Sequence, residues 1–502
     1  MYQGFIVVRF ICGCHAPNWS SNLNLSPTKI LAFTTTTGTA GAADSFIGTS
    51  GVDSILIQNQ TDASFLGGQL GNDDITVTHF QGLTSGQTIR GGGGDDTLTT
   101  NNATTYNDSF IAFDGGDDTL NTAALTTATL QGNLGNDVIT LAGLVNNSLA
   151  NGNQGTDTIN INGGQSGSDI FGGIDDDSIV INSNITSASR IQGNEGAEAI
   201  TITAGVELQG STINGNQGND TILVAAVGAV ADTTIYGGVG NDTITGNTTA
   251  ANRSLAYSSD DGNDSITGGI GNDTIFNSAG NDSIVTGAGA NSVSTAGGNS
   301  TITTGAGVDT VTTGTGTDTV LLAGGADQVN TGAGNDRVNS TIANATVANS
   351  VMAGGSGTDA FHITDATAPT DLSTNLTYSG WELLSFDADD TDGGADGITL
   401  DQGFFSSGAV TLTITGGSDG DDDTLTLIAG GTAWEADTGT GTGSETSAAA
   451  VDIAGEYFLD NTTADGVLTY FNQGTSAATT VTITALDGGA VAITGDNLVW
   501  TA

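Results

Sequence analysis

The chain has 502 residues and a formal net charge of −49 at pH 7, with 55 acidic residues against 6 lysines and arginines. Such a charge argues against nucleic acid or an anionic membrane surface as a partner, because both are bound through Lys and Arg. Only seven of the acids are glutamate, and aspartate dominates where a short carboxylate lies in a turn or binds a hard cation. Hydrophobic residues reach 36%, too many for a purely disordered acidic tail.

Residues 1–40 are interpreted as an irregular leader, or as an over-extended start of the reading frame. They contain both cysteines, Cys12 and Cys14, and an apolar run that Arg9 interrupts. This run lacks a basic n-region, and it is too short to span a membrane, so it is a poor signal peptide. Two cysteines and His15 are too few ligands for a zinc site. The sequence after residue 15 has no cysteine, so no disulfide is expected there.

Residues 41–262 are predicted to form a β-solenoid with coils of about 22 residues. In this stretch an acidic residue, followed two positions later by a large apolar residue, recurs in steps of 19 to 23 residues. Glycines before each acidic residue permit the positive φ of a tight turn. Each step is therefore expected to be one coil with one Gly-Asp turn and a longer plain turn opposite. The series is Asp53, Asp73, Asp96, Asp118, Asp137, Asp157, Asp177, Glu198, Asp220, Asp242 and Asp264.

Residues 263–364 repeat every nine residues, as in GGIGNDTIF (residues 268–276). In each unit the short strand is expected to point Ile or Val inward and Thr outward, with one such apolar residue per strand. Two units form an 18-residue coil, so alternate units stack. The series continues with Asp273, Asp282, Asn291, Ser300, Asp309, Asp318, Asp327 and Asp336, and Asp359 follows 23 residues later.

Stacking places the aspartates of successive coils about 4.8 Å apart, where their like charges repel. A bound cation would resolve this repulsion, although turn hydrogen bonds without metal are the alternative. In the nonapeptide region the intact pairs are Asp264/Asp282, Asp318/Asp336 and Asp309/Asp327, while Ser300 and Asn291 leave gaps. The candidate metal ligands are Asp73, Asp96, Asp118, Asp137, Asp157, Asp177, Asp220, Asp242, Asp264, Asp273, Asp282, Asp309, Asp318, Asp327 and Asp336.

The nonapeptides GGIGNDTIF and GGVGNDTIT (residues 237–245) fit the pattern Gly-Gly-x-Gly-x-Asp-x-apolar-x. Over about residues 44–360 the chain resembles the RTX calcium-binding β-roll proteins. The resemblance implies a right-handed parallel β-roll that binds multiple Ca²⁺ ions between its turns through Asp carboxylates and backbone carbonyls. It also implies bacterial type I secretion through an uncleaved C-terminal signal. The longer coils depart from the 18-residue roll, which leaves their cross-section open.

The predicted fold class is all-β: a parallel β-solenoid of roughly fifteen coils, followed by a smaller all-β domain. Residues 365–502 lose the repeat but contain strand-like runs between Gly/Asp turns, so a compact β domain, possibly a sandwich, is expected there. The C-terminal GDNLVWTA resembles an RTX secretion signal, and it is equally compatible with a final strand.

An enzyme is not expected. The histidines are His15, His79 and His362, and none lies in a His-Glu-x-x-His motif. A polysaccharide lyase would need a basic residue near its acids, and the arginines of the repeats are too scattered to nominate a site. Those arginines are Arg90, Arg190, Arg253 and Arg337.

The favoured function is an extracellular structural or surface-layer protein that folds on calcium. Its expected partners are calcium and either a cell-surface polysaccharide or further copies of itself, with no nucleic acid and no membrane span. A calcium-dependent adhesin or an ice-binding module is the alternative, suggested by outward Thr pairs, and a lyase-type enzyme is the third. A flat ice-binding face would need an unbroken column of Thr residues. This column is interrupted by Val138, Ala199, Gln328 and Arg337.

Overall fold

The computed structural model describes residues 6–8, 30–34 and 44–388, the last with short gaps at 49, 61–62, 81–85, 101–104, 144, 226–229, 247–254, 346, 367–369 and 372–375. After residue 388 it describes the strands alone. The chain divides into two compact units, Met1–Ser265 and Ile266–Ala502. Both are built of β-strands, and together they contain about 14 turns of parallel β-solenoid, which confirms the predicted fold class. Among the described residues the helical element is the short α1 (Ile342–Ala345).

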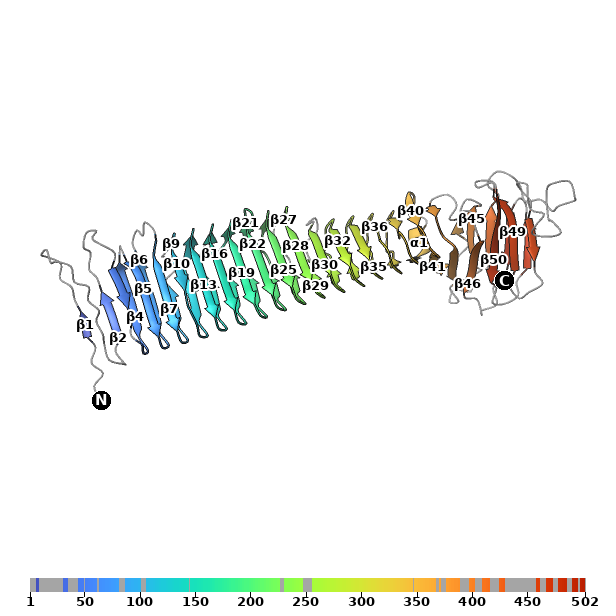
Figure 1. The fold of residues 1–502 in the computed structure, drawn as a ribbon. Coiled ribbons are helices and arrows are strands. Elements are labelled where there is room, and N and C mark those ends of the chain that lie inside the picture. The colour runs from blue at the N-terminus through green and yellow to red at the C-terminus, as the bar shows by residue number, and fades with distance from the viewer. Residues whose placement is uncertain are drawn as a thin grey trace. The chain divides into compact units, whose positions relative to one another are not determined.

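From residue 105 to residue 231 the coils of the first unit have three sides. In one coil β16 (Leu149–Gln154) leads through a Gly-Asp turn into β17 (Thr158–Ile161), and the two-residue β18 (Gln165–Ser166) follows. Each of these strands pairs in parallel with its counterpart in the next coil (Figure 1). The longer plain turn expected opposite the Gly-Asp turn therefore contains a short third strand, which gives the long coils their cross-section.

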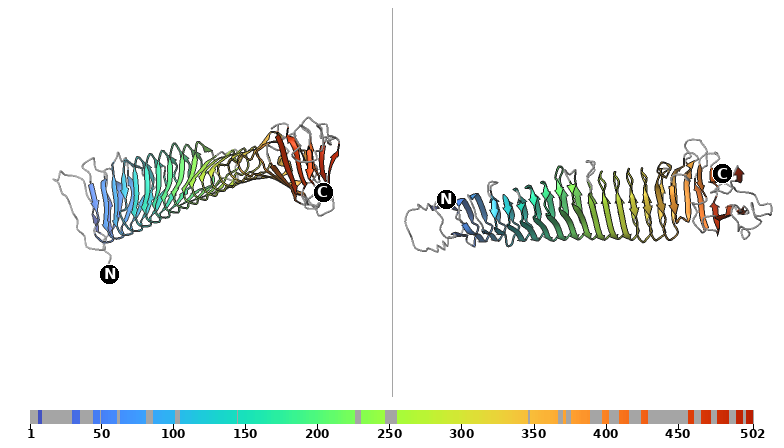
Figure 2. Two further views of the ribbon diagram at one scale, coloured as in Figure 1. Left: turned by 45° about the vertical axis from the view of Figure 1, so that its right-hand side comes forward. Right: turned by 90° about the horizontal axis from the view of Figure 1, so that it is seen from above.

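Three parallel sheets run along the first unit (Figure 2). The sheet that follows the Gly-Asp turns contains β1 (Ile6–Val8), β2 (Ile30–Thr34), β4 (Ser54–Gln60), β6 (Asp74–Phe80), β8 (Thr97–Thr100), β11 (Thr119–Thr122), β14 (Val138–Leu141), β17, β20 (Ser178–Ile181), β23 (Ala199–Ile202), β26 (Thr221–Val224) and β29 (Thr243–Thr245). The sheet that precedes them contains β3 (Asp44–Ile47), β5 (Ala63–Leu70), β7 (Thr88–Gly93), β10 (Phe110–Ala112), β13 (Thr129–Leu134), β16, β19 (Asp169–Ile174), β22 (Arg190–Glu195), β25 (Thr212–Gln217), β28 (Thr234–Val239) and β30 (Ala256–Asp261). The third sheet contains β9 (Thr105–Asn107), β12 (Ala124–Thr126), β15 (Val145–Asn146), β18, β21 (Ile185–Thr186), β24 (Leu208–Gln209) and β27 (Val230–Ala231).

The core of the first unit is wider than one apolar residue per strand. Because side chains alternate between the two faces of a strand, a four-residue strand can bury two of them. In β17 these are Ile159 and Ile161, and in β20 they are Ile179 and Ile181, all fully buried. The expectation of one inward apolar residue per strand is thus wrong for the long coils. It holds for the three-residue strands of the nonapeptide region, such as β36 (Thr310–Thr312), where Val311 alone points inward.

The second unit begins with two parallel sheets whose strands repeat every 18 residues. Thr274 pairs with Ser292 and Ser283 pairs with Thr301, which confirms that alternate nonapeptides stack. The strands of one sheet are β32 (Thr274–Ala279), β34 (Ser292–Gly297), β36, β38 (Gln328–Asn330), β40 (Ser350–Ala353) and β43 (Leu376–Ser379). Those of the other are β33 (Ser283–Val285), β35 (Thr301–Thr303), β37 (Thr319–Leu321), β39 (Arg337–Ser340), β41 (Ala360–Ala366), β44 (Leu383–Ala388) and β46 (Ala409–Thr415). In sequence, β31 (Ser265–Thr267) spans the division between the units.

Parallel pairing continues beyond residue 364. β41 pairs with β44, and β44 pairs with β46. Trp381 is buried against Phe361, with ring centroids 5.5 Å apart, and its Nε1–H donates to the Met352 carbonyl at 3.2 Å. This tryptophan therefore packs on the last coils of the solenoid.

The later strands mix the two pairing directions. β42 (Thr370–Asp371), β45 (Gly397–Asp401) and β47 (Thr424–Ile428) are parallel, whereas β47, β52 (Asn497–Thr501) and β51 (Ala490–Thr494) pair antiparallel. β46 pairs in parallel with β50 (Ala477–Thr484), which pairs antiparallel with β49 (Gly466–Asn472), and β49 pairs antiparallel with β48 (Tyr457–Asp460).

Candidate metal centre

Every candidate ligand lies at the same place in its coil, directly after the glycine-rich turn and before a strand. In the coil that contains Asp157, Gly152 and Gly155 lie in the turn, and β17 begins at Thr158. All the candidate aspartates are buried, with at most 2% of their surface exposed. Burial of so many carboxylates requires compensation, because an ionised group loses its hydration when it leaves water.

One oxygen of each carboxylate is used by the backbone of the neighbouring coil. The N–H of Asp118 donates to Oδ1 of Asp137 at 2.8 Å, and the N–H of Asp137 donates to Oδ1 of Asp157 at 2.8 Å. The same bond joins the other neighbours of the long coils, from Asp53 to Asp177 and from Glu198 to Asp264. In the nonapeptide region it joins Asp273, Asn291, Asp309 and Asp327 in one column, and Ser300, Asp318, Asp336 and Asp359 in the other. The predicted stacking within these columns is therefore confirmed.

The second oxygen of each carboxylate, Oδ2, indicates whether a ligand is missing from the site. Oδ2 is buried and accepts no hydrogen bond at Asp73, Asp96, Asp118, Asp137, Asp157, Asp177, Asp220, Asp309, Asp318, Asp327 and Asp336. Two candidates differ: Oδ2 of Asp242 accepts from the Ser259 hydroxyl at 3.2 Å, and Oδ2 of Asp273 accepts from the Gly269 N–H at 2.8 Å. Asp264 and Asp282 lie at the corresponding place in their coils and are equally buried. A regular row of buried acceptors without donors favours a cation as the missing partner.

In most of the long coils a glycine keeps open the space beside this oxygen, at Asp73, Asp96, Asp137, Asp157, Asp177 and Asp220. A Cβ added to Gly152 would lie only 1.9 Å from Oδ2 of Asp157 and 2.6 Å from the carbonyl oxygen of Gly172 in the next coil. At Gly132 the same atom would lie 2.0 Å from Oδ2 of Asp137 and 2.8 Å from the Gly152 carbonyl oxygen. A carboxylate and a carbonyl oxygen thus border one small space that contains no side chain. Oxygen ligands of this kind suit Ca²⁺.

Asn291 shows how a hydrogen-bond donor can occupy the position that Oδ2 has in the aspartates. Its Oδ1 accepts from the Asp273 N–H at 2.8 Å, as an aspartate Oδ1 does elsewhere in the column. Its Nδ2 donates to the carbonyls of Gly287 and Gly289, at 3.4 and 3.3 Å. An aspartate presents an acceptor where this amide presents a donor, so either a cation or a proton on the carboxyl would bridge it to the turn carbonyls.

The surroundings raise the pKa values of the buried carboxyls. The pKa is raised to about 7 at Asp137 and to about 8 at Asp118, mainly by burial and also by neighbouring carboxylates, while the backbone N–H bond acts in the opposite direction. Burial is likewise the main cause that raises the pKa to about 7 at Asp73 and Asp177, and to about 6 at Asp96, Asp157, Asp242, Asp327 and Asp359. Without a compensating charge the carboxyls with a pKa of about 7 or 8 hold a proton for much of the time at neutral pH, whereas those with a pKa of about 6 are mostly ionised there. A bound cation would favour the ionised form instead.

A second row of hydrogen bonds runs beside the aspartates in the opposite direction. The N–H of Asn241 donates to Oδ1 of Asn219, and the N–H of Asn263 donates to Oδ1 of Asn241, both at 2.7 Å. Here the later coil donates to the earlier one, whereas in the aspartate row the earlier coil donates. Neighbouring coils are thus joined by two oppositely directed side chain–backbone bonds, which need no metal. The alternative role as turn hydrogen-bond acceptors therefore applies to one oxygen of most candidate aspartates and leaves the other without a donor, whereas at Asp242 the second oxygen also accepts a hydrogen bond, as it does at Asp273.

Three further carboxylates, Asp53, Glu198 and Asp359, occupy the same columns outside the predicted set of ligands. Neither oxygen of Glu198 has a hydrogen-bond partner, and burial raises its pKa to about 9. Asp359 also has a buried Oδ2 without a partner, and its N–H donates to Oε2 of Glu382 at 2.9 Å. All three carboxylates belong to the sequence series, so their spacing was sufficient to identify them.

Within the described part of the chain, no three His, Cys, Asp or Glu side chains converge on one point. A cation held between coils would therefore take most of its ligands from backbone carbonyls. In the same residues, no helix has the length and apolar character needed to cross a bilayer.

Comparison with known proteins identifies the repeats. The model of the RTX calcium-binding nonapeptide repeat (4 copies) matches residues 82–104, 211–224, 228–248, 258–284, 285–320 and 303–338. Some of these matches lie in the long coils of the first unit, and others lie in the nonapeptides of the second unit. Neither a curated protein nor a solved structure matches the chain. The nonapeptide matches, together with the parallel solenoid and its columns of buried aspartates, make the chain an RTX hemolysin-type calcium-binding repeat protein.

Proposed function

We propose that the protein is a secreted structural component of a bacterial cell surface, whose solenoid becomes stable when it binds calcium outside the cell. The observation that carries this proposal is the row of buried Oδ2 atoms without donors, which at Asp73, Asp96, Asp137, Asp157, Asp177 and Asp220 lie beside a space that a glycine keeps open. In this proposal Asp137 and Asp157, with the turn carbonyls beside them, hold one ion between their coils, and the other neighbouring pairs act likewise. The ion supplies the positive charge that buried carboxylates lack.

The energetics favour folding outside the cell. Extracellular calcium modules bind with Kd of roughly 10⁻⁴–10⁻³ M. At a hundredfold excess of calcium over Kd, each site contributes about 2.7 kcal/mol to the folded state. Cytosolic calcium is far below such Kd values, so the same sites contribute almost nothing before export. The unneutralised charge of −49 then keeps the repeats expanded.

Circular dichroism of the full chain tests the calcium dependence. Excess chelator should abolish the β-sheet signal, and millimolar calcium should restore it cooperatively. Magnesium at the same concentration is the control, because Mg²⁺ is smaller than Ca²⁺ and requires a stricter octahedral coordination geometry. A chain that keeps its full signal in chelator would contradict the proposal.

Secretion and surface assembly need separate experiments. Deleting residues 487–502 should retain the protein inside its cell if this segment is the export signal, whereas an equally short deletion within residues 431–446 should not. Electron microscopy of the purified protein should show ordered arrays after calcium addition if it forms a surface layer. Soluble monomers at millimolar calcium would argue against the layer.

An adhesin or ice-binding role is the second candidate. Outward Thr pairs such as Thr243/Thr245 and Thr310/Thr312 support it, but Ala199, Gln328 and Arg337 interrupt the row with exposed side chains of other kinds. Ice-crystal shaping by the calcium-loaded protein would favour this candidate. We also propose that the protein is not an enzyme, and release of unsaturated sugars from acidic polysaccharides would show the contrary.

A further inference from the structure

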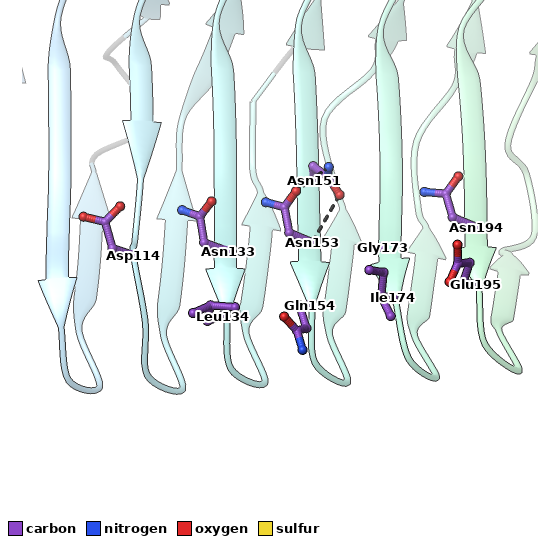
Figure 3. A pocket seen from close by; sticks show the side chains of 10 residues that line it. All are labelled: Asp114, Asn133, Leu134, Asn151, Asn153, Gln154, Gly173, Ile174, Asn194 and Glu195. Carbon is purple, nitrogen blue, oxygen red and sulfur yellow. Dashed lines mark hydrogen bonds between the residues drawn. The ribbon is translucent and has the colours of Figure 1, made fainter.

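A shallow groove crosses the outer face of the sheet that precedes the Gly-Asp turns. It has a volume of about 610 Å³ and lies over β13, β16, β19 and β22 (Figure 3). The groove is separate from the aspartate columns, whose carboxylates are buried on the inner side of the turns. Its lining is formed by Asp114, Asn133, Leu134, Asn151, Asn153, Gln154, Gly173, Ile174, Asn194 and Glu195.

A row of asparagines defines the floor of this groove. Asn133 pairs with Asn153 in the next coil, Asn153 pairs with Gly173, and Gly173 pairs with Asn194. The three asparagines have φ of 81°, 84° and 93°, a left-handed conformation that Asn tolerates better than most residues. Figure 3 shows their amides in line across the strands, and Gly173 leaves a gap in that line because it has no side chain.

The groove offers amide groups rather than charges. Nδ2 of Asn151 donates to Oδ1 of Asn153, and the N–H of Asn153 donates to Oδ1 of Asn151. Nδ2 of Asn153 is buried and has no hydrogen-bond partner. If the amide rotates toward the groove, this nitrogen can donate a hydrogen bond to a ligand. The charge of Asp114 is balanced by Arg90, 3.2 Å away. Such a surface can both donate and accept hydrogen bonds without attracting a strongly charged ligand.

Apolar groups border the amide row. Leu134 is 55% exposed and Ile174 is 48% exposed, at one edge of the groove. Amides beside exposed apolar side chains suit a ligand that carries hydroxyl groups together with C–H surfaces. The spacing of the strands, about 4.8 Å, is also close to the length of one sugar ring along a linear chain.

We propose that this groove binds a neutral linear oligosaccharide laid across the strands, with about one sugar ring per coil. The sugar hydroxyls exchange hydrogen bonds with Asn153 and Asn194, and ring C–H groups contact Leu134 and Ile174. A polyanion is disfavoured by the net charge of −49 and by Glu195 in the lining. An added peptide strand is disfavoured because the groove lies on a sheet face, where the strand backbones are already paired. This site goes beyond the proposed structural role, since calcium-dependent folding does not require it.

Isothermal titration calorimetry on the calcium-loaded full chain tests the site. The probes are neutral hexasaccharides of β-1,4-linked glucose, β-1,4-linked N-acetylglucosamine, β-1,3-linked glucose and α-1,4-linked glucose. We expect at least one to bind, and its affinity to fall when the chain is shortened to a disaccharide. In the double variant Asn153→Gly, Asn194→Gly the affinity should drop about tenfold or more, because two amide contacts are lost.

Glycine is chosen because it keeps the positive φ at both positions without strain. The matched control is Gln69→Gly, a position with φ of 91° at the same place in a coil outside the groove, which should bind like the native chain. Circular dichroism in calcium verifies that each variant is folded, and Asn194→Asp, which keeps the side-chain shape, provides a second test with an expected loss. The proposal is overturned if no hexasaccharide binds, if the double variant binds as tightly as the native chain, or if an acidic oligogalacturonate binds better than every neutral probe.

Discussion

In the calcium-binding role that we propose, the aspartates of the columns perform two tasks with two oxygens. Oδ1 of Asp318 accepts the Ser300 N–H at 2.7 Å, while its Oδ2 is buried without a donor. The nearby Thr313 hydroxyl does not satisfy it, because that hydroxyl donates to the Thr331 carbonyl at 2.6 Å. The structural task needs one acceptor and could be performed by Asn, as Asn291 demonstrates. The metal-binding task is what requires a carboxylate.

Asp318→Asn should therefore remove about one bound calcium while keeping the coil contacts. In chelator the variant should keep more β-sheet signal than the native chain, because its amide can donate to the turn carbonyls, which contributes about 1–3 kcal/mol. Calorimetry measures the number of ions, and circular dichroism in chelator compares the folded fractions. The reverse change, Asn291→Asp, should add an ion. If both changes leave the stoichiometry unaltered, the columns do not bind metal as described.

Gly152→Ala should abolish binding at one coil by filling the space beside Asp157. Its added Cβ would lie 1.9 Å from Oδ2, and the atoms around it are backbone and a buried carboxylate that cannot move aside easily. Gly115→Ala is the matched control, because its Cβ would meet no atom closer than 3.8 Å. Calcium titration should show about one ion fewer for the first variant alone. Equal stoichiometry in the two variants would refute the assignment of this space.

The raised pKa values predict that acid stabilises the metal-free solenoid. Asp137 and Asp118 have folded-state pKa values of about 7 and about 8, whereas in the unfolded chain the value is near 3.9. Between these values the folded state holds more protons, so the free energy of unfolding falls as the pH rises. This contribution is fully present below about pH 4 and is lost as the pH rises through about 6 to 8.

In chelator more of the β-sheet signal should thus remain at pH 5 than at pH 8. Salt at about 1 M screens repulsion between surface charges, so the difference that remains reports the buried groups. In millimolar calcium, where the chain is folded, the melting temperature should instead be higher at pH 8, because protons compete with the ion for the carboxylates. A chelated protein that keeps more β-sheet signal at pH 8 than at pH 5 would contradict the pKa assignments.

At the scale of the elements, the repeat spacing predicted the Gly-Asp turns, the strands that follow them and the stacking of alternate nonapeptides. Asp309 stacks with Asp327 because 18 residues form one coil, and sequence alone contains that information. The third sheet of the long coils was not predicted. β15 and β18 have two residues each, and the single inward residue of β18 is Gln165, so neither an apolar run nor an alternation marks that strand.

The detail of the site was also beyond the sequence. The spacing predicts Asp242 and Asp273 as ligands along with the others. It does not reveal that Ser259 and Gly269 donate hydrogen bonds to their second oxygens. These donors depend on the three-dimensional course of each turn. Conversely, Glu198 and Asp359 follow the series and could have been nominated from their positions.

Glu382 closes one aspartate column. Its Oε2 accepts the N–H of Asp359 at 2.9 Å, as an aspartate of a further coil would, and β44 begins at the next residue. Glu382→Ala should leave this buried N–H without an acceptor and accelerate its hydrogen exchange about ten- to hundredfold, since a bond to a charged group contributes about 1.5–3 kcal/mol. Glu382→Gln keeps an acceptor oxygen and should show a smaller effect. Unchanged exchange at Asp359 in the Ala variant would show that the cap contributes nothing.

At the scale of the molecule, the backbone pairing and both hydrogen-bond rows of the first unit join neighbouring coils. Thr158 and Ser178 occupy equivalent places in successive coils, so deletion of the 20 residues 158–177 joins Asp157 to Ser178 in register. The shortened chain should fold on calcium and bind about one ion fewer. Deletion of half that segment, residues 158–167, breaks the register and should prevent the cooperative calcium response. Equal behaviour of the two deletions would show that register does not govern folding.

The oppositely directed hydrogen-bond rows have a consequence for how such a chain changes over generations. Each coil donates a hydrogen bond to its neighbour and accepts one from it. A duplicated coil therefore brings its own donors and acceptors, and the hydrogen-bonding groups of the other coils keep their partners. Gene segments that encode whole coils can therefore be gained or lost without redesign of the remainder. The number of coils becomes a trait that selection can adjust in single steps.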